Sequence, residues 1–339
     1  MDIKKEKVLV TGASGYIALQ CISDLLNSGY KVKGSLRDPN RENQVRVSLD
    51  NKLSDENLEF CYLDLLSDEG WEDAASDCDF LFHIASPFLI EEPKDESILI
   101  EPAVEGTLRA LKSAKNSRIR KVILTSSMAT IAYGHFKEKC DKNDWTDVSK
   151  NVGAYIKSKT LAEKAAWDFV HKQVDNEFVL TTIHPGMVFG PLLSDDFEGA
   201  SASLIYNLIS GKFPALPDLY FTVVDVRDVA KLHVQSLVNP RSNNKRIIAT
   251  SESGISFLEI SKLLRKLGYD KSPTNLIPNK VINSLAPFNK GMRSTANMIK
   301  RGCYKVDISE TKLLYKWEPI QLFKTLKDMT KSLERKGIF

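Results

Sequence analysis

A short apolar segment, a turn with two glycines and the start of an amphipathic stretch follow one another directly near the beginning of the chain. Residues 8–10 are Val-Leu-Val, and the turn holds Gly12 and Gly15. Gly12 permits the turn, Gly15 lets a pyrophosphate approach the backbone, and the N–H groups at the helix start supply positive potential. Ala18 stands where a third glycine often sits. An ordinary strand-to-helix turn is the alternative, but the position in the first strand–helix–strand unit favours a dinucleotide site.

Short β-branched, apolar segments alternate with longer amphipathic ones through the first half of the chain, which is typical of strand–helix–strand units. Right-handed crossovers between such strands give an α/β fold with a doubly wound parallel (Rossmann) sheet. Strands are expected at 8–11, 31–36, 58–62, 79–84, 121–125 and 178–184, with helices such as 17–26 and 104–114 between them.

Prolines and glycines punctuate the sequence after residue 185, which predicts a smaller C-terminal substrate-binding lobe. We expect a nucleotide-binding core at 1–188 and a lobe mainly at 189–339, interleaved with the core. Segments 223–226 and 246–249 have the composition of strands, so the core sheet is expected to receive both. The Lys-rich segment 321–336 has the spacing of a solvated helix.

Composition limits what the chain can bind. Its 339 residues carry 47 Lys and Arg against 44 Asp and Glu, a net charge of +3 without long blocks, so nucleic acid is not an implied partner. The charged start lacks the apolar core of a secretory signal, and no segment approaches the ~20 apolar residues of a membrane span. We therefore expect a cytoplasmic protein, with monomer and homodimer both open. The cysteines and histidines show no metal-ligand spacing, so no metal is expected.

The end of the second expected strand bears on the choice between NADP and NAD. An acidic residue there accepts hydrogen bonds from the ribose of NAD, whereas an arginine can pair with the 2′-phosphate of NADP. Arg37 therefore favours NADP(H). If the neighbouring Asp38 turned inward, NAD(H) would be favoured and Arg37 would be only a surface charge.

A tyrosine and a lysine lie four residues apart in a long amphipathic stretch, so a helix places Tyr155 and Lys159 on one face. Hydride delivery to a carbonyl carbon leaves an alkoxide that needs a proton donor. A free tyrosine has a pKa of about 10, and a nearby ammonium lowers it. The same ammonium could hold the nicotinamide ribose. Tyr133 and Lys137 have the same spacing but lie in a glycine-containing loop.

Two serines follow the fifth expected strand, at the sheet edge where doubly wound folds carry their sites. A hydroxyl from Ser126 or Ser127 can hydrogen-bond the oxyanion that develops there. The sequence thus predicts a Ser, Tyr and Lys set for carbonyl reduction.

These motifs together resemble the extended short-chain dehydrogenase/reductase family, and within it the dihydroflavonol-reductase-like branch of aldehyde and ketone reductases. The resemblance covers nearly the whole chain. It depends on segments 11–17, 36–39, 63–65, 83–87, 124–127, 155–159, 162–167, 185–191 and 224–230.

The resemblance implies further roles. Ser127 matches the family's catalytic serine, which leaves Ser126 as a structural or cofactor-side neighbour, and segment 225–230 looks structural. Relatives often carry a lysine where this chain has Gln44, and Arg41 could substitute for it. The implied cofactor contacts are Ser14, Tyr16 and Ile17 in the glycine turn, Asp64 and Leu65 at the adenine, Ala85 along the cofactor, and Pro185, Val188 and Ser203 at the nicotinamide end.

Three functions are open. The preferred one is NADPH-dependent reduction of an aldehyde or ketone, a small-molecule carbonyl substrate with an apolar or aromatic body. The second is an NAD-dependent nucleotide-sugar epimerase or dehydratase, in which Arg293 could serve a phosphate. The third is a non-catalytic NADP-binding regulator, which the complete Ser, Tyr and Lys set argues against. Candidate pocket walls are Phe88, Phe189, Tyr206, Phe213 and Phe288.

Overall fold

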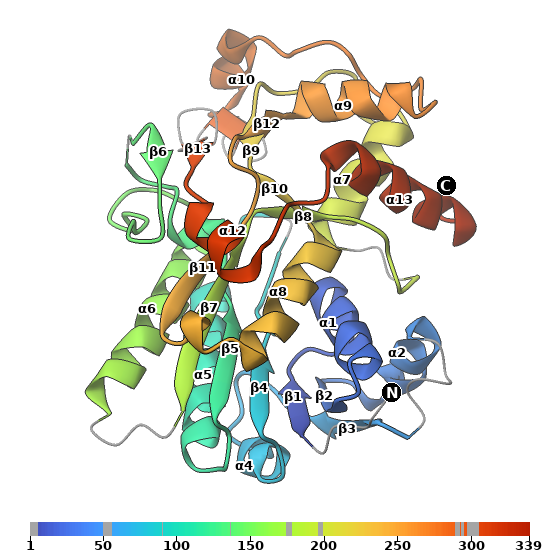
Figure 1. Ribbon diagram of the computed structural model, residues 1–339. Coiled ribbons are helices and arrows are strands. Elements are labelled where there is room, and N and C mark those ends of the chain that lie inside the picture. Colours follow the sequence, from blue (N-terminus) through green and yellow to red (C-terminus); the bar gives the residue numbers. More distant parts are fainter. Residues whose placement is uncertain are drawn as a thin grey trace.

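Seven parallel strands form the central sheet of the computed structural model, in the order β11-β7-β5-β4-β1-β2-β3 (Figure 1). The structure describes residues 6–49, 56–89, 91–135, 137–173, 178–195, 199–288, 292, 295–296 and 305–339. The strands are β1 (Lys7–Val10), β2 (Lys31–Leu36), β3 (Leu58–Tyr62), β4 (Phe80–His83), β5 (Lys121–Thr125), β7 (Val179–Pro185) and β11 (Lys245–Ala249). This confirms the doubly wound Rossmann fold, and each of the first six strands ends within one residue of its expected limits.

Helices cover both faces of the sheet, and the strands alternate between them. Leu9 and Leu81 belong to the apolar core shared with α5 (Ser97–Lys115) and α6 (Ala154–Lys172). Val8, Val10 and Phe82 point the other way, into the core shared with α1 (Tyr16–Asn27) and α8 (Val226–Val238). Because neighbouring residues of a strand face opposite sides, a sheet covered on both faces needs such apolar runs.

Helix α5 begins earlier than expected. The sequence predicts a start at 104, yet the helix begins at Ser97 and continues through Pro102. A proline removes one backbone hydrogen bond, and tertiary packing offsets that loss here, since Leu99 and Ala103 on either side are 1 % and 3 % exposed.

The C-terminal part builds a second core beyond the carboxyl ends of the strands (Figure 1). It contains α7 (Ala200–Ile209), α9 (Phe257–Lys266) and α13 (Leu322–Arg335), packed through residues such as Ile205, Leu264 and Met329. Three two-stranded sheets accompany it: β8 (Met187–Phe189) with β10 (Val223–Asp225), β9 (Tyr220–Phe221) with β12 (Ile255–Ser256), and β6 (Lys139–Cys140) with β13 (Lys305–Val306).

Two expectations for this part need correction. Segment 223–226 does not join the central sheet, because β10 pairs with β8 in a separate sheet, while β11 does join it. Helix α13 is solvated on one face only, since Leu326, Met329 and Leu333 are fully buried. The division at residue 188 stays a prediction.

The remaining segments are short connections around these layers. Within the described ranges, none of the helices is both long and apolar enough to cross a bilayer. The connections are η1 (Pro39–Arg41), α2 (Glu42–Ser48), α4 (Trp71–Ala75), η2 (Met128–Thr130), η3 (Pro240–Ser242), α10 (Asn279–Leu285) and α12 (Ser309–Tyr315).

Candidate active site

The turn between β1 and α1 brings the backbone of Gly12, which carries no side chain, close to Ala85 after the end of β4. Gly12 has a φ of +71°, and a Cβ there would lie 3.2 Å from the Cα of Ala85. The Ser35 hydroxyl accepts a hydrogen bond from the Gly12 N–H at 3.2 Å. Gly15 then caps α1 without any side-chain bond to the first helical turn. This is a cradle for an anionic group, because unpaired N–H groups and the helix dipole both point toward it.

A cavity of about 1770 Å³ extends from this turn across the carboxyl ends of the strands to the C-terminal lobe. It brings together nearly all the predicted site residues. One does not line it: Ser203, although Ser201, Ala202 and Leu204 of the same helix do. The predicted residues at the cavity are Gly12, Ser14, Gly15, Tyr16, Ile17, Arg37, Asp64, Leu65, Ala85, Ser126, Ser127, Tyr155, Lys159, Pro185 and Val188.

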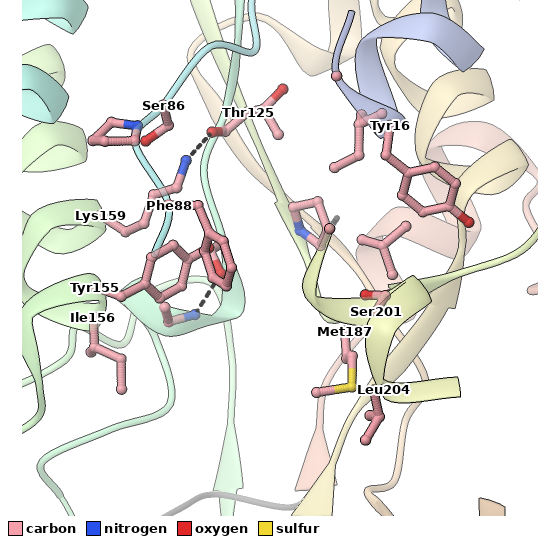
Figure 2. Close-up of a pocket in the computed structure, with 18 of the residues that line it drawn as sticks. Tyr16, Ser86, Phe88, Thr125, Tyr155, Ile156, Lys159, Met187, Ser201 and Leu204 are labelled. Carbon is pink, nitrogen blue, oxygen red and sulfur yellow. Dashed lines mark hydrogen bonds between the residues drawn. The ribbon is translucent and has the colours of Figure 1, made fainter. Parts of the chain in front are cut away.

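Helix α6 presents the predicted proton donor to this cavity (Figure 2). Tyr155 is its second residue, and its hydroxyl forms a side-chain hydrogen bond with Ser127. Lys159, one turn further, donates to the carbonyl oxygen of Thr125 at 3.2 Å. The ring of Phe88 packs edge-on against Tyr155 with centroids 5.3 Å apart. The backbone N–H of Ala129 donates to the Ser127 hydroxyl at 3.1 Å, so this oxygen already accepts one bond.

The proton affinities of the two groups are set mainly by burial. Burial raises the pKa of Tyr155, and the hydrogen bond from Ser127 opposes that rise. Burial lowers the pKa of Lys159 to about 8, against the attraction of Glu163. We expected the Lys159 ammonium to lower the pKa of Tyr155. In this structure the group that lowers it is Ser127.

The part of the cavity next to the end of β2 carries two arginines, Arg37 and Arg41. Asp38 also lines the cavity, but its exposed carboxylate accepts hydrogen bonds from the backbone and side chain of Asn40 at 3.0 and 2.9 Å. Gln44 accepts from Arg41 Nε at 3.0 Å and donates to the Ser194 hydroxyl at 3.1 Å. It therefore links Arg41 to the loop after β8, which sequence reasoning did not anticipate.

Two other polar contacts were missed. The Tyr16 hydroxyl donates to the carbonyl oxygen of Gly190 at 2.7 Å, which ties the first helix to the chain after β8. The Ser126 hydroxyl, expected to be a structural or cofactor-side neighbour, donates to the buried carboxylate of Glu163 at 2.7 Å. Neither contact has a local sequence signal, because the partners lie 174 and 37 residues apart.

Apolar side chains form the half of the cavity away from the glycine turn. Of the five aromatic residues predicted as walls, Phe88 and Phe213 line it. Phe189 is buried in the lobe core, Tyr206 lies outside the lining, and Phe288 is 89 % exposed. Figure 2 shows Met187 and Leu204 across the cavity from Tyr155. The walls that sequence reasoning did not name are Met187, Leu204, Tyr220, Phe221 and Phe257.

The competing tyrosine and lysine pair is resolved by the structure. Tyr133 lines the cavity, but Lys137 forms an ion pair with Asp144, and the two do not share a helix face. Arg293, considered for a sugar-nucleotide phosphate, lies outside the described residues.

A Rossmann sheet with a bare glycine turn, and a tyrosine and lysine one helical turn apart at the same cavity, define a dinucleotide-binding protein of the short-chain dehydrogenase/reductase type. Residues 8–249 match the family model described as "NAD dependent epimerase/dehydratase family". The chain therefore belongs to that family.

Named relatives lie in its reductase branch. The chain is 37 % identical to cinnamoyl-CoA reductase CAD2 of Medicago truncatula, over 77 % of this chain and 80 % of the relative. It is 31 % identical to the bifunctional dihydroflavonol 4-reductase/flavanone 4-reductase of Malus domestica, over 83 % and 80 %. The crystal structure of yeast methylglyoxal/isovaleraldehyde reductase Gre2 complexed with NADPH superposes with a TM-score of 0.79 at 27 % identity, covering 98 % of this chain and all of that one. These relatives confirm the predicted resemblance to the dihydroflavonol-reductase-like branch.

Proposed function

We propose that the chain is an NADPH-dependent carbonyl reductase that converts an aldehyde or ketone into the corresponding alcohol. The relatives named above are reductases, and one of them is a structure that holds NADPH. The observation that carries the proposal is that Ser127, Tyr155 and Lys159 line one cavity, which begins at the glycine turn.

The residues present fit the cofactor. Gly12 keeps the backbone bare where a Cβ would already reach Ala85, so a diphosphate can come close to the turn and to the start of α1. Arg37 and Arg41 would pair with the 2′-phosphate, and Lys159 would contact the nicotinamide ribose. Ser203 stays a predicted contact, although Ser201 of the same helix, and not Ser203, lines the cavity.

The reaction needs one hydride and one proton. When bound, NADPH would supply the hydride for the new C–H bond at the carbonyl carbon. Tyr155 gives its phenolic proton to the carbonyl oxygen, while Ser127 hydrogen-bonds that oxygen as negative charge develops. Lys159 stabilises the phenolate that is left behind. The apolar half of the cavity favours a substrate with an apolar or aromatic body, which excludes water from the reacting atoms.

The two alternatives receive less support. A nucleotide-sugar epimerase shows no net consumption of NADPH, and a regulator has no use for a proton donor beside the cofactor. The reductase relatives favour reduction over both.

The test is loss of NADPH absorbance across a panel of aliphatic and aromatic aldehydes and ketones, with NADH run beside it. We expect turnover with NADPH, and a fall in kcat of about a hundredfold or more for Tyr155→Phe. Tyr269→Phe is the control, because that hydroxyl bonds Glu334 away from the cavity. Equal turnover with and without the Tyr155 hydroxyl would remove the acid assignment.

We also propose a cytoplasmic enzyme that works as a monomer or homodimer on a small carbonyl substrate. A reducing compartment suits the free thiols of Cys21, Cys61 and Cys78. Cell fractionation and analytical ultracentrifugation test the two parts separately.

A further inference from the structure

A buried carboxylate lies one helical turn beyond the predicted catalytic lysine. Glu163 is 1 % exposed on α6. Arg246 Nε lies 2.7 Å from its Oε1 atom, and His184 Nε2 lies 3.2 Å from the same atom. Trp167 Nε1 also donates to Oε1, at 3.1 Å. A buried charge persists only when it is paired and hydrogen-bonded, so these partners fix the position of the carboxylate.

Apart from Trp167 on the same helix, the named partners of Glu163 lie on or directly after three adjacent strands. Ser126 follows β5, His184 belongs to β7, and Arg246 belongs to β11. Arg246 itself is held firmly, because it also donates to the carbonyl oxygens of Lys142 and Asp144 at 2.6 and 2.7 Å. Its guanidinium lies 3.9 Å from the centroid of the Trp145 ring. The carboxylate thus connects α6 to the edge of the sheet where the cavity opens.

Glu163 and the buried groups around it contact both serines or their backbone. The Ser126 hydroxyl donates to Glu163 Oε2 at 2.7 Å, and His184 Nδ1 lies 3.3 Å from the carbonyl oxygen of Ser127. The Thr130 hydroxyl lies 3.1 Å from the same His184 nitrogen and accepts from Arg246 at 3.1 Å. The backbone on both sides of the Ser127 side chain is therefore anchored to buried groups.

We propose that Glu163 is a positioning residue for catalysis: it fixes the Ser126–Ser127 turn and places a negative charge on the same helix as Lys159. The proposal rests on the proposed function, since it concerns the same Ser, Tyr and Lys set. Glu163 contacts neither cofactor nor substrate, because its carboxylate is enclosed behind Ser126.

The charge of Glu163 also reaches Lys159. Burial lowers the pKa of Lys159 to about 8, and the attraction of Glu163 opposes that fall. The titratable groups around the two residues are Tyr155 on α6, His83 on β4, His184 on β7 and Arg246 on β11. Of these, His83 and His184 have lowered pKa values because of burial and stay neutral near pH 7. Removing the carboxylate charge therefore makes Lys159 lose its proton at lower pH.

Two variants separate the hydrogen bond from the charge. Ser126→Ala removes only the hydroxyl that Glu163 holds, and Glu163→Gln removes the charge but keeps an oxygen for Arg246. We expect each variant to lower kcat by about tenfold, because each loses one hydrogen bond to a charged group. The Kd of NADPH should change by less than about twofold. In addition, the basic limb of the kcat–pH profile should move to lower pH in Glu163→Gln and stay in place in Ser126→Ala.

Glu310→Gln is the matched control. This carboxylate pairs with Lys142 and Lys245 beside β11 but lies away from the serines, so kcat and its pH profile should not change. Unchanged kcat in Ser126→Ala, or a basic limb that does not move in Glu163→Gln, overturns the proposal. If Glu163→Gln fails to fold, Ser126→Ala alone tests the proposal, by whether its kcat falls while its Kd for NADPH holds. Activity that survives Tyr155→Phe would instead overturn the catalytic assignment on which the proposal rests.

Discussion

At the scale of single residues, the two side chains after β2 determine the choice of cofactor. Both Arg37 and Asp38 line the cavity, but the Asp38 carboxylate also accepts hydrogen bonds within the turn that follows it. We expect Arg37→Ala to raise the Kd of NADPH by about ten- to a hundredfold, because a charged hydrogen bond contributes roughly 1.5–3 kcal/mol, and to leave the Kd of NADH nearly unchanged. Fluorescence titration with both dinucleotides measures the two constants.

Asp38→Asn is the companion variant. The amide oxygen can still accept from the Asn40 N–H, so we expect neither dinucleotide to bind differently. If this variant instead weakened NADH alone, Asp38 would be a ribose ligand and the preference for NADPH would need another origin.

Sequence reasoning succeeded where a residue's role depends on near neighbours in the chain. Gly12 lies just after β1, and Tyr155 and Lys159 share one helical turn, so local spacing and context placed them. Spacing left Ser126 open between a structural and a cofactor-side place, because its acceptor Glu163 comes from a different element. Spacing also did not show that Ser201 lines the cavity, since it and Ser203 are serines on α7 that only the rotation of the helix separates.

At the scale of secondary structure, the first turn of α6 depends on a carboxylate from a distant loop. Glu92 Oε1 accepts from the Ala154 N–H at 2.6 Å, immediately before Tyr155. We expect Glu92→Ala to lower the free energy of unfolding by about 1 kcal/mol, the usual effect of losing a charged helix cap. The kcat should fall severalfold as the first turn frays, while the NADPH Kd holds. Urea unfolding and steady-state kinetics measure the two effects.

Glu96→Ala serves as the control for that experiment. Glu96 forms an exposed ion pair with Lys157 of the same helix, and such pairs contribute at most ~1 kcal/mol and often nothing measurable. We expect stability within about 0.5 kcal/mol of the parent and unchanged kcat. A similar loss of stability in Glu92→Ala and Glu96→Ala would mean that negative charge near α6 in general, and not the helix cap, stabilises the protein.

Strands were predicted well and the lobe less well, for one physical reason. A strand covered on both faces is rich in apolar residues, as 121–125 is with Val, Ile and Leu, and this strand was placed without error. Segment 31–36 was placed equally well, although it is Lys-Val-Lys-Gly-Ser-Leu. Segment 223–226 is apolar too, but composition does not say which strand it pairs with, and β8 is its partner. Segment 321–336 was predicted to be a solvated helix, because lysines separate the residues that α13 buries.

At the scale of the whole molecule, buried neutral histidines make stability depend on pH. Burial lowers the pKa of His83 to about 3 and that of His233 to about 4, from a usual value of 6.5. Between those values the unfolded chain binds protons that the folded chain does not. The stability that depends on keeping these two histidines neutral is therefore fully present above pH 6.5. It is lost as the pH falls, by about 1.4 kcal/mol per pH unit for each histidine.

Replacing one of them tests this dependence. We expect His233→Asn to reduce the slope of unfolding free energy against pH, between about pH 4 and 6.5, by up to 1.4 kcal/mol per unit. The variant should also be less stable at neutral pH, because the side chain packs against Phe82 and contacts the Thr125 hydroxyl at 2.8 Å. Urea unfolding followed by tryptophan fluorescence gives the slope. An unchanged slope would show that His233 titrates alike in both states.

The late arrival of β11 in the sequence has a consequence for how the protein is made. The other six strands of the sheet leave the ribosome first, yet β7 lacks its outer neighbour until residues 245–249 have been synthesised. An uncovered strand edge is a template for pairing with other chains. Translation of the intervening segment is thus the interval in which the nascent chain is most exposed to aggregation, and in which a chaperone would have the most to shield.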